Sequence, residues 1–132
     1  MDAPAVAVSR DGKVLGVAWM AAPDGSKGRD VFWAVAKAGG GFGGDVLLPA
    51  DSRGIQGHPS AAVDGDGAFH IVWEDGRADG TQIWYQSSAA GAKNVALSAP
   101  ADGPATFPSL AVGTSVGVAW EQVGGVRFLK VK

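Results

Sequence analysis

Three segments of this 132-residue chain share one pattern, and this internal repeat constrains the fold more than any other feature. Each segment begins with a proline, reaches a valine four residues later, passes through a short polar turn and arrives at a tryptophan. The segments are 4–20, 59–75 and 108–122, with Trp19, Trp73 and Trp120 near their ends. The proline-to-proline steps are 55 and 49 residues. This period predicts one structural unit that is repeated three times.

The pieces of each repeat have the composition of short strands. They are rich in valine, isoleucine and aromatic residues, and glycine, aspartate and proline bound them. No segment keeps an apolar period of 3.6 residues, so we expect almost no helix. Residues 9–12 and 64–67 have the composition of tight hairpin turns. The expected strands are 4–9, 13–21, 30–37 and 45–49, then 59–64, 68–74, 81–88 and 93–98, then 108–112, 115–121 and 125–131.

Four strands in about 50 residues are typical of a β-propeller blade. We therefore predict an all-β chain of three blades, at residues 4–52, 58–102 and 107–132, the third of which lacks its outer strand. Small residues in the first strand of each blade suit the crowded centre of a propeller. We expect the tryptophans, and the aromatic residues Trp33, Trp84 and Phe128 of the third strands, to pack between blades. Stacking of one of them on a sugar is the alternative.

The string HPSAAVDGDGAFHIVWEDGRADGTQIWYQSS, residues 58–88, resembles the repeat unit of sialidase-like (BNR-type) β-propellers. That unit has a P-S-x-A-V-D start, a strand that ends W-x-D-x-R, and an I-Y/W-Y-x-x-S strand. The resemblance extends over the whole chain as three blades and implies the fold and an exported, secreted or periplasmic parent. The S-x-D-x-G-x-x-W box of true sialidases is absent, and no residue matches the catalytic arginines, aspartate and Tyr–Glu pair. Tyr85, the only tyrosine, falls inside a strand.

Three blades do not close a ring, because propellers have about four to eight. An open arc would expose apolar faces that carry Trp19, Trp33, Trp120 and Phe128. Twofold association is the commonest way to cover such faces. We expect a homodimer that forms one six-bladed propeller. The alternative is that the other half is a different polypeptide or has been cut away.

Half of the charged residues fall in the loops expected at one end of the blades, 20–30, 50–58, 74–81, 99–107 and 121–125. Arg29, Arg53 and Arg77 come from three of these loops and could together bind a carboxylate or sulfate. The alternative is that each arginine pairs with a nearby aspartate. The candidate residues for binding a carbohydrate or protein ligand are Arg29, Arg53, His58, Glu74, Asp75, Arg77 and Glu121.

Other patterns argue against catalysis or cofactors. Glu74 and Asp75 are adjacent in a strand, so they point to opposite sides and are unsuited to act together on a glycosidic bond. The aspartates of 64–67 and 75–79 do not have the spacing of a calcium loop, and His58 and His70 lack further metal ligands. Gly39–Gly41 is no phosphate loop, since no lysine and helix follow. We expect no cofactor, no metal and no catalytic residue.

Composition limits the classes of partner and chemistry that we expect for the chain. The net charge of −2 is scattered, which favours neither nucleic acid nor a membrane surface. The absence of cysteine excludes disulfides, thiolate metal sites and a cysteine nucleophile. Residues 1–20 lack the pattern of a signal peptide, as expected of a mature, truncated or cytoplasmic chain, so the localisation stays open. Our first hypothesis is a non-catalytic binding or scaffold module. The alternatives are a sialidase-like glycoside hydrolase, a glycan-binding lectin, or a fragment without activity of its own.

Overall fold

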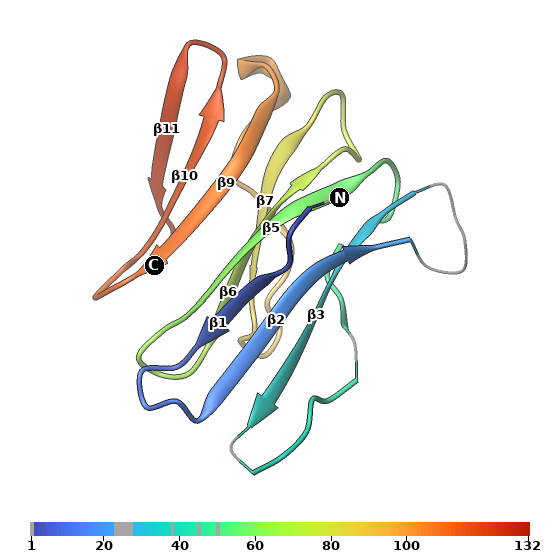
Figure 1. Ribbon diagram of the computed structural model, residues 1–132. Coiled ribbons are helices and arrows are strands. Elements are labelled where there is room, and N and C mark those ends of the chain that lie inside the picture. The colour runs from blue at the N-terminus through green and yellow to red at the C-terminus, as the bar shows by residue number, and fades with distance from the viewer. Residues whose placement is uncertain (1, 23–27, 38, 45, 50) are drawn as a thin grey trace.

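The computed structural model describes residues 2–22, 28–37, 39–44, 46–49 and 51–132, which form three antiparallel β-sheets and no α-helix (Figure 1). The first sheet contains β1 (Ala5–Val8), β2 (Val14–Ala21), β3 (Asp30–Lys37) and β4 (Val46–Leu47) in that order. The second contains β5 (Gln56–Val63), β6 (Phe69–Asp75), β7 (Gln82–Ser87) and β8 (Val95–Ala96), and the third β9 (Ala105–Val112), β10 (Val116–Gln122) and β11 (Gly125–Lys130). One 3-10 turn, Pro100–Asp102, precedes β9.

The all-β prediction and the sheet of three strands at the third repeat are confirmed. No helix in the described ranges could cross a membrane. The expected turns are also present, because the Gly12 and Gly67 N–H groups bond back to the carbonyls of Ser9 and Asp64 at 2.8 and 3.0 Å. Both glycines have a positive φ, of 71° and 81°, which a side chain would disfavour.

The predicted starts of β5 and β9 and the predicted lengths of the outer strands were wrong. β5 and β9 each begin three residues before the expected start, and the pairing register of each shifts around its proline. A bulge lets the strand continue past a residue that cannot donate a ladder hydrogen bond. The outer strands β4 and β8 are only two residues long, shorter than expected.

The register also corrects the expected equivalence of Trp33, Trp84 and Phe128. The residue just before each repeat tryptophan pairs with Trp33 in β3, with Tyr85 in β7 and with Phe128 in β11. Trp84 instead pairs with Trp73 itself, one position away. Successive strand residues face opposite sides of a sheet, so Trp84 lies on the other face from the position that Trp33 and Phe128 share.

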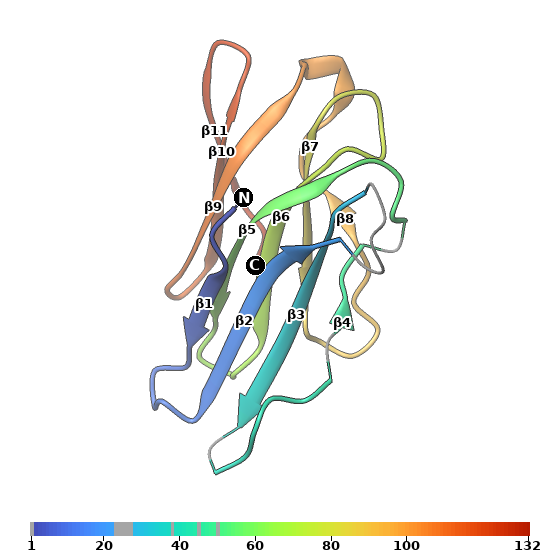
Figure 2. The same ribbon diagram turned by 45° about the vertical axis from the view of Figure 1, so that its right-hand side comes forward.

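The second sheet lies between the other two, and the first strands β1, β5 and β9 lie beside one another (Figures 1 and 2). Two apolar clusters fill the spaces between the sheets. The cluster between the first and second sheets contains Ala18, Val31, Leu48, Ile71 and Trp73, and the one between the second and third contains Val72, Ile83, Ala105, Leu110, Val116, Val118 and Trp120. Ile71 and Val72 therefore belong to different clusters, as strand alternation requires.

This packing decides which aromatic side chains stay outside. Trp120 is 6% exposed and Trp33 packs on Phe69, with ring centroids 5.8 Å apart, so the expectation that both lie on open faces is wrong. Phe128 is 73% exposed, and Trp19 stacks on Phe32 outside both clusters. The two outer faces of the stack each keep part of the predicted apolar surface.

Backbone hydrogen bonds between neighbouring sheets recur with the repeat. The N–H of Gln56 donates to the Arg29 carbonyl at 2.7 Å, and the N–H of Ala105 donates to the Thr81 carbonyl at 2.8 Å. In each case the start of one sheet's first strand binds the segment before the third strand of the previous sheet. These bonds bring the connecting loops to one end of the stack.

Candidate functional site

The loop end of the stack contains all the candidate residues, and two of its arginines are held by aspartates two positions earlier in the chain. The Asp51–Arg53 and Asp75–Arg77 pairs have nearly the same local geometry. In each, the arginine N–H and Nε donate to the aspartate Oδ1 at 2.9–3.0 Å, and Nη2 donates to Oδ2 at 2.5 or 2.6 Å. The forked face of each guanidinium is therefore already occupied by its own carboxylate.

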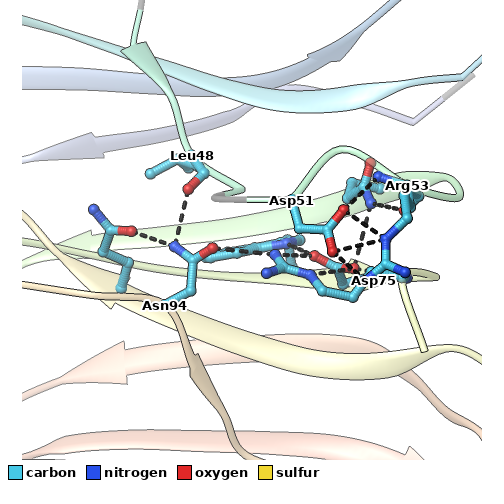
Figure 3. Close-up of polar contacts among 9 residues, drawn as sticks. Leu48, Asp51, Arg53, Asp75 and Asn94 are labelled. Atoms are coloured by element: carbon cyan, nitrogen blue, oxygen red, sulfur yellow. Dashed lines mark hydrogen bonds and ion pairs between the residues drawn. The ribbon is translucent and has the colours of Figure 1, made fainter.

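Asp75 is fully buried and is the centre of a polar network (Figure 3). Besides Arg77, its carboxylate accepts hydrogen bonds from Trp73 Nε1 at 2.9 Å and from Gln56 Nε2 at 3.3 Å. Arg77 also lies over the ring of Trp84, with Cζ 4.0 Å from the ring centroid. These partners hold the carboxylate and guanidinium in place within the second sheet.

The network continues into the first sheet. Arg77 Nη2 donates to Asn94 Oδ1 at 3.1 Å, and Asn94 Nδ2 donates to the Leu48 carbonyl at 2.9 Å (Figure 3). Asn94 Nδ2 also donates to Gln86 Oε1. Asp75 and Arg77 therefore help to connect the first two sheets. This supports the alternative that each arginine pairs with a nearby aspartate.

Arg53 and Arg29 are in a different environment. The Arg53 side chain is 79% exposed, and Arg29 is exposed as well. The hydrogen bonds from Arg53 lower the pKa of Asp51 to about 2, and the charge of Arg77 contributes to this shift. Arg53 thus binds Asp51 and Arg77 binds Asp75, while the backbone carbonyl of Arg29 accepts a hydrogen bond from the Gln56 N–H.

His58 lies between two carboxylates. Its Nε2 is 3.1 Å from Asp2 Oδ1 and its Nδ1 is 3.0 Å from Glu74 Oε2. Glu74 and Asp75 point to opposite faces of β6, since Glu74 contacts His58 and Phe107 whereas Asp75 contacts Arg77. Sequence reasoning missed Asp2, because nothing in the pattern links it to a histidine 56 residues away.

A second cluster that the sequence analysis missed lies at the opposite end of the second sheet. The carboxylate of Asp64 accepts hydrogen bonds from His70 Nε2 at 2.8 Å and Lys132 Nζ at 2.7 Å, and His70 Nδ1 is 2.7 Å from the Tyr85 hydroxyl. Burial by itself raises the pKa of Asp64, but these hydrogen bonds, with those from the backbone, outweigh it and hold the pKa well below its usual range. Burial raises the pKa of the Tyr85 phenol. A titratable residue that occurs in only one repeat is not part of a repeated pattern, so the sequence gave no signal of this cluster.

Glu121 lies apart from the other candidates, on the third sheet. It is exposed and lines an open groove of about 410 Å³ together with Pro104, Thr106, Val123 and Gly124. Among the residues that the structure describes, no group of three or more His, Asp or Glu could hold a metal ion. No protein-family model matches the chain, and no curated protein matches its sequence.

Proposed function

We propose that this chain is a non-catalytic β-propeller scaffold in which each sheet is a blade, and that two copies associate through their end faces to complete a six-bladed ring. One observation carries this proposal. The two kinds of surface that meet at the internal sheet interfaces are also the two kinds that the outer faces expose. Binding of a carbohydrate or protein by the completed ring is part of the proposal, because propellers carry ligands on their loop faces.

At the first internal interface, a face that has small residues in its second strand, β2, and Trp33 in β3 receives a face of bulky residues. The small face belongs to the first sheet, where Ala18 is buried and a Cβ added to Gly16 would lie 1.7 Å from the ring of Phe69. The bulky face belongs to the second sheet and includes Ile71 and Trp73. The next interface has the same orientation, with Val118 and Trp120 of the third sheet packed toward Ala62 and Val72, and here the receiving face also carries the larger Ile83 and Tyr85.

The two ends of the stack each expose one of these faces. The outer face of the first sheet is the bulky type, with Val6 and Val8 more than half exposed and an apolar hollow of about 370 Å³ lined by Val17, Trp19, Ala34 and Phe42. The outer face of the third sheet is the small type. It contains Gly117 and Ala119, which alternate with the buried residues of β10, and Phe128 beside them.

Complementary end faces favour a head-to-tail contact between copies rather than a contact with an unrelated protein. An exposed apolar face of this kind on a soluble chain indicates an interaction surface. A head-to-tail contact closes into a ring when its rotation permits and otherwise continues into a filament. A ring of two chains would give the six blades expected from the sequence.

The local chemistry favours a scaffold over a hydrolase. A glycosidase needs two carboxyl groups that flank the bond to be cleaved, one of them free to give a proton. Glu74 is occupied by His58 and the Phe107 N–H, and Asp75 is buried beneath Arg77. Neither is available to a sugar without loss of these contacts.

Light scattering on the purified chain tests the assembly. We expect a particle of twice the chain mass of 13.3 kDa. Ala119→Arg should give the monomer because it places a charge on the small face, whereas Thr114→Arg, in the exposed β9–β10 turn, should leave the mass unchanged. A wild-type monomer at all concentrations would refute the assembly, and turnover of a fluorogenic sialoside would refute the absence of catalysis. A glycan array tests carbohydrate binding by the assembled form.

A further inference from the structure

The two internal interfaces share one polar contact at the loop end. In each, a carboxylate accepts a hydrogen bond from the backbone N–H of the residue that precedes the repeat proline of the next sheet. The acceptor is Asp2, just before β1, at the first interface and Glu74, within β6, at the second. Asp2 Oδ2 accepts from the His58 N–H at 2.7 Å, and Glu74 Oε1 accepts from the Phe107 N–H at 2.6 Å.

The backbone conformation explains why these N–H groups need an external acceptor. His58 and Phe107 have φ values of 46° and 53°, which is uncommon for residues other than glycine. Both lie where the pairing register of their strand shifts. A bulge leaves its extra residue outside the ladder, so its N–H has no partner in its own sheet. A charged acceptor from the neighbouring sheet satisfies it and helps to hold the strained conformation.

The third sheet carries the same acceptor without a donor. Glu121 follows Trp120 and pairs with Val126, just as Glu74 follows Trp73 and pairs with Ile83. Within the described part of the chain, the side-chain carboxylate of Glu121 has no hydrogen-bond or ion-pair partner. The groove that it lines occupies the place where, in the second sheet, Phe107 meets Glu74.

The first sheet carries the matching donor. Ala3 precedes Pro4 as His58 precedes Pro59, and the residue after each proline pairs with the one before the repeat tryptophan. Ala3 is exposed, and its N–H donates no backbone hydrogen bond among the residues described.

We infer that Glu121 of one copy accepts a hydrogen bond from the Ala3 N–H of a second copy, whose residues 2–4 occupy the groove beside Glu121. This inference rests on the proposed assembly and specifies the contact that sets its register. The occupant is a second copy of this chain because the proline and the residue before it recur in all three repeats, and the acceptor glutamate recurs in the second and third. In the first repeat Met20 stands at the glutamate position, and Asp2 is the acceptor instead. In a ring of two chains the contact is made twice.

Substitution of Glu121 measures the contact. A hydrogen bond to a charged group contributes enough to change an equilibrium constant by roughly 10- to 100-fold, so loss of two should weaken dimerisation at least about 100-fold. We expect this for Glu121→Ala and a smaller loss for Glu121→Gln, which keeps an acceptor oxygen. Asp79→Ala, which removes an exposed carboxylate elsewhere at the loop end, is the matched control and should have no effect.

A cross-linking experiment tests the position directly, because the chain has no cysteine of its own. Mixed Ala3→Cys and Val126→Cys proteins should be joined by a short thiol-reactive cross-linker, because Val126 is an exposed residue of the same groove and its substitution keeps Glu121. Ala3→Cys mixed with Thr114→Cys, at the far end of the third sheet, should not be joined. A wild-type dimer with unchanged affinity in Glu121→Ala and no selective cross-link would refute this contact and leave the assembly standing. A wild-type monomer would refute both.

Discussion

The two Asp-x-Arg pairs provide a matched test of how burial changes the value of an ion pair. The pairs Asp51–Arg53 and Asp75–Arg77 have the same spacing and nearly the same hydrogen bonds. The Arg53 side chain is 79% exposed, whereas that of Arg77 is 9% exposed and covers a carboxylate with no exposed surface. We predict that Arg77→Ala strongly destabilises the chain and that Arg53→Ala does not.

The magnitude follows from what each substitution leaves behind. Without Arg77, the Asp75 carboxylate stays buried and loses its compensating charge, and breaking a buried pair in this way costs about 3–5 kcal/mol. The loss of the contact with the Trp84 ring adds to this cost. Without Arg53, Asp51 is rehydrated by water, and exposed pairs contribute little to stability. For a domain that is stable by about 5–15 kcal/mol, the first change removes a large part of the total.

Urea denaturation followed by tryptophan fluorescence measures both free energies of unfolding. Arg77→Lys is a useful third variant, since it keeps the charge but not the fork, and it should fall between wild type and Arg77→Ala. If Arg53→Ala and Arg77→Ala lowered the free energy of unfolding equally, burial would not determine how much each ion pair contributes to stability. That result would refute the reasoning.

Two other predictions concern the interfaces and the acid response. Gly16→Ala should lower the free energy of unfolding by about 1–3 kcal/mol, because the added Cβ overlaps the Phe69 ring, and Phe69→Leu in the same chain should restore part of the loss; a stabilised Gly16→Ala would contradict the packing. The pKa of Asp64 is lower in the folded chain than in the unfolded one, so its contribution is complete above the unfolded pKa of about 4 and is lost as pH falls through the acid range. Urea unfolding at pH 5 and pH 3 should therefore show a smaller acid loss in Asp64→Asn than in wild type, and identical losses would exclude this role.

Much of the strand arrangement was predictable, because strand composition, turn residues and a repeated pattern are local signals. The turns at 9–12 and 64–67 were found this way, and so was the sheet of three strands. The bulges at His58 and Phe107 were missed, since a bulge depends on the neighbouring sheet that supplies an acceptor for the N–H. The shift of Trp84 to the opposite face is a one-residue difference in register, which composition does not reveal.

The candidate site shows the same division. The spacing in Asp75-Gly76-Arg77 and in Asp51-Ser52-Arg53 determines by itself that each arginine can bind its own aspartate, because a turn of three residues brings the two side chains together. Only the tertiary structure decides that one pair is covered by Trp84 and joined to the first sheet through Asn94 while the other stays in water. Burial depends on which sheets pack over a loop, and the strength of a charge interaction depends on how much water that packing removes.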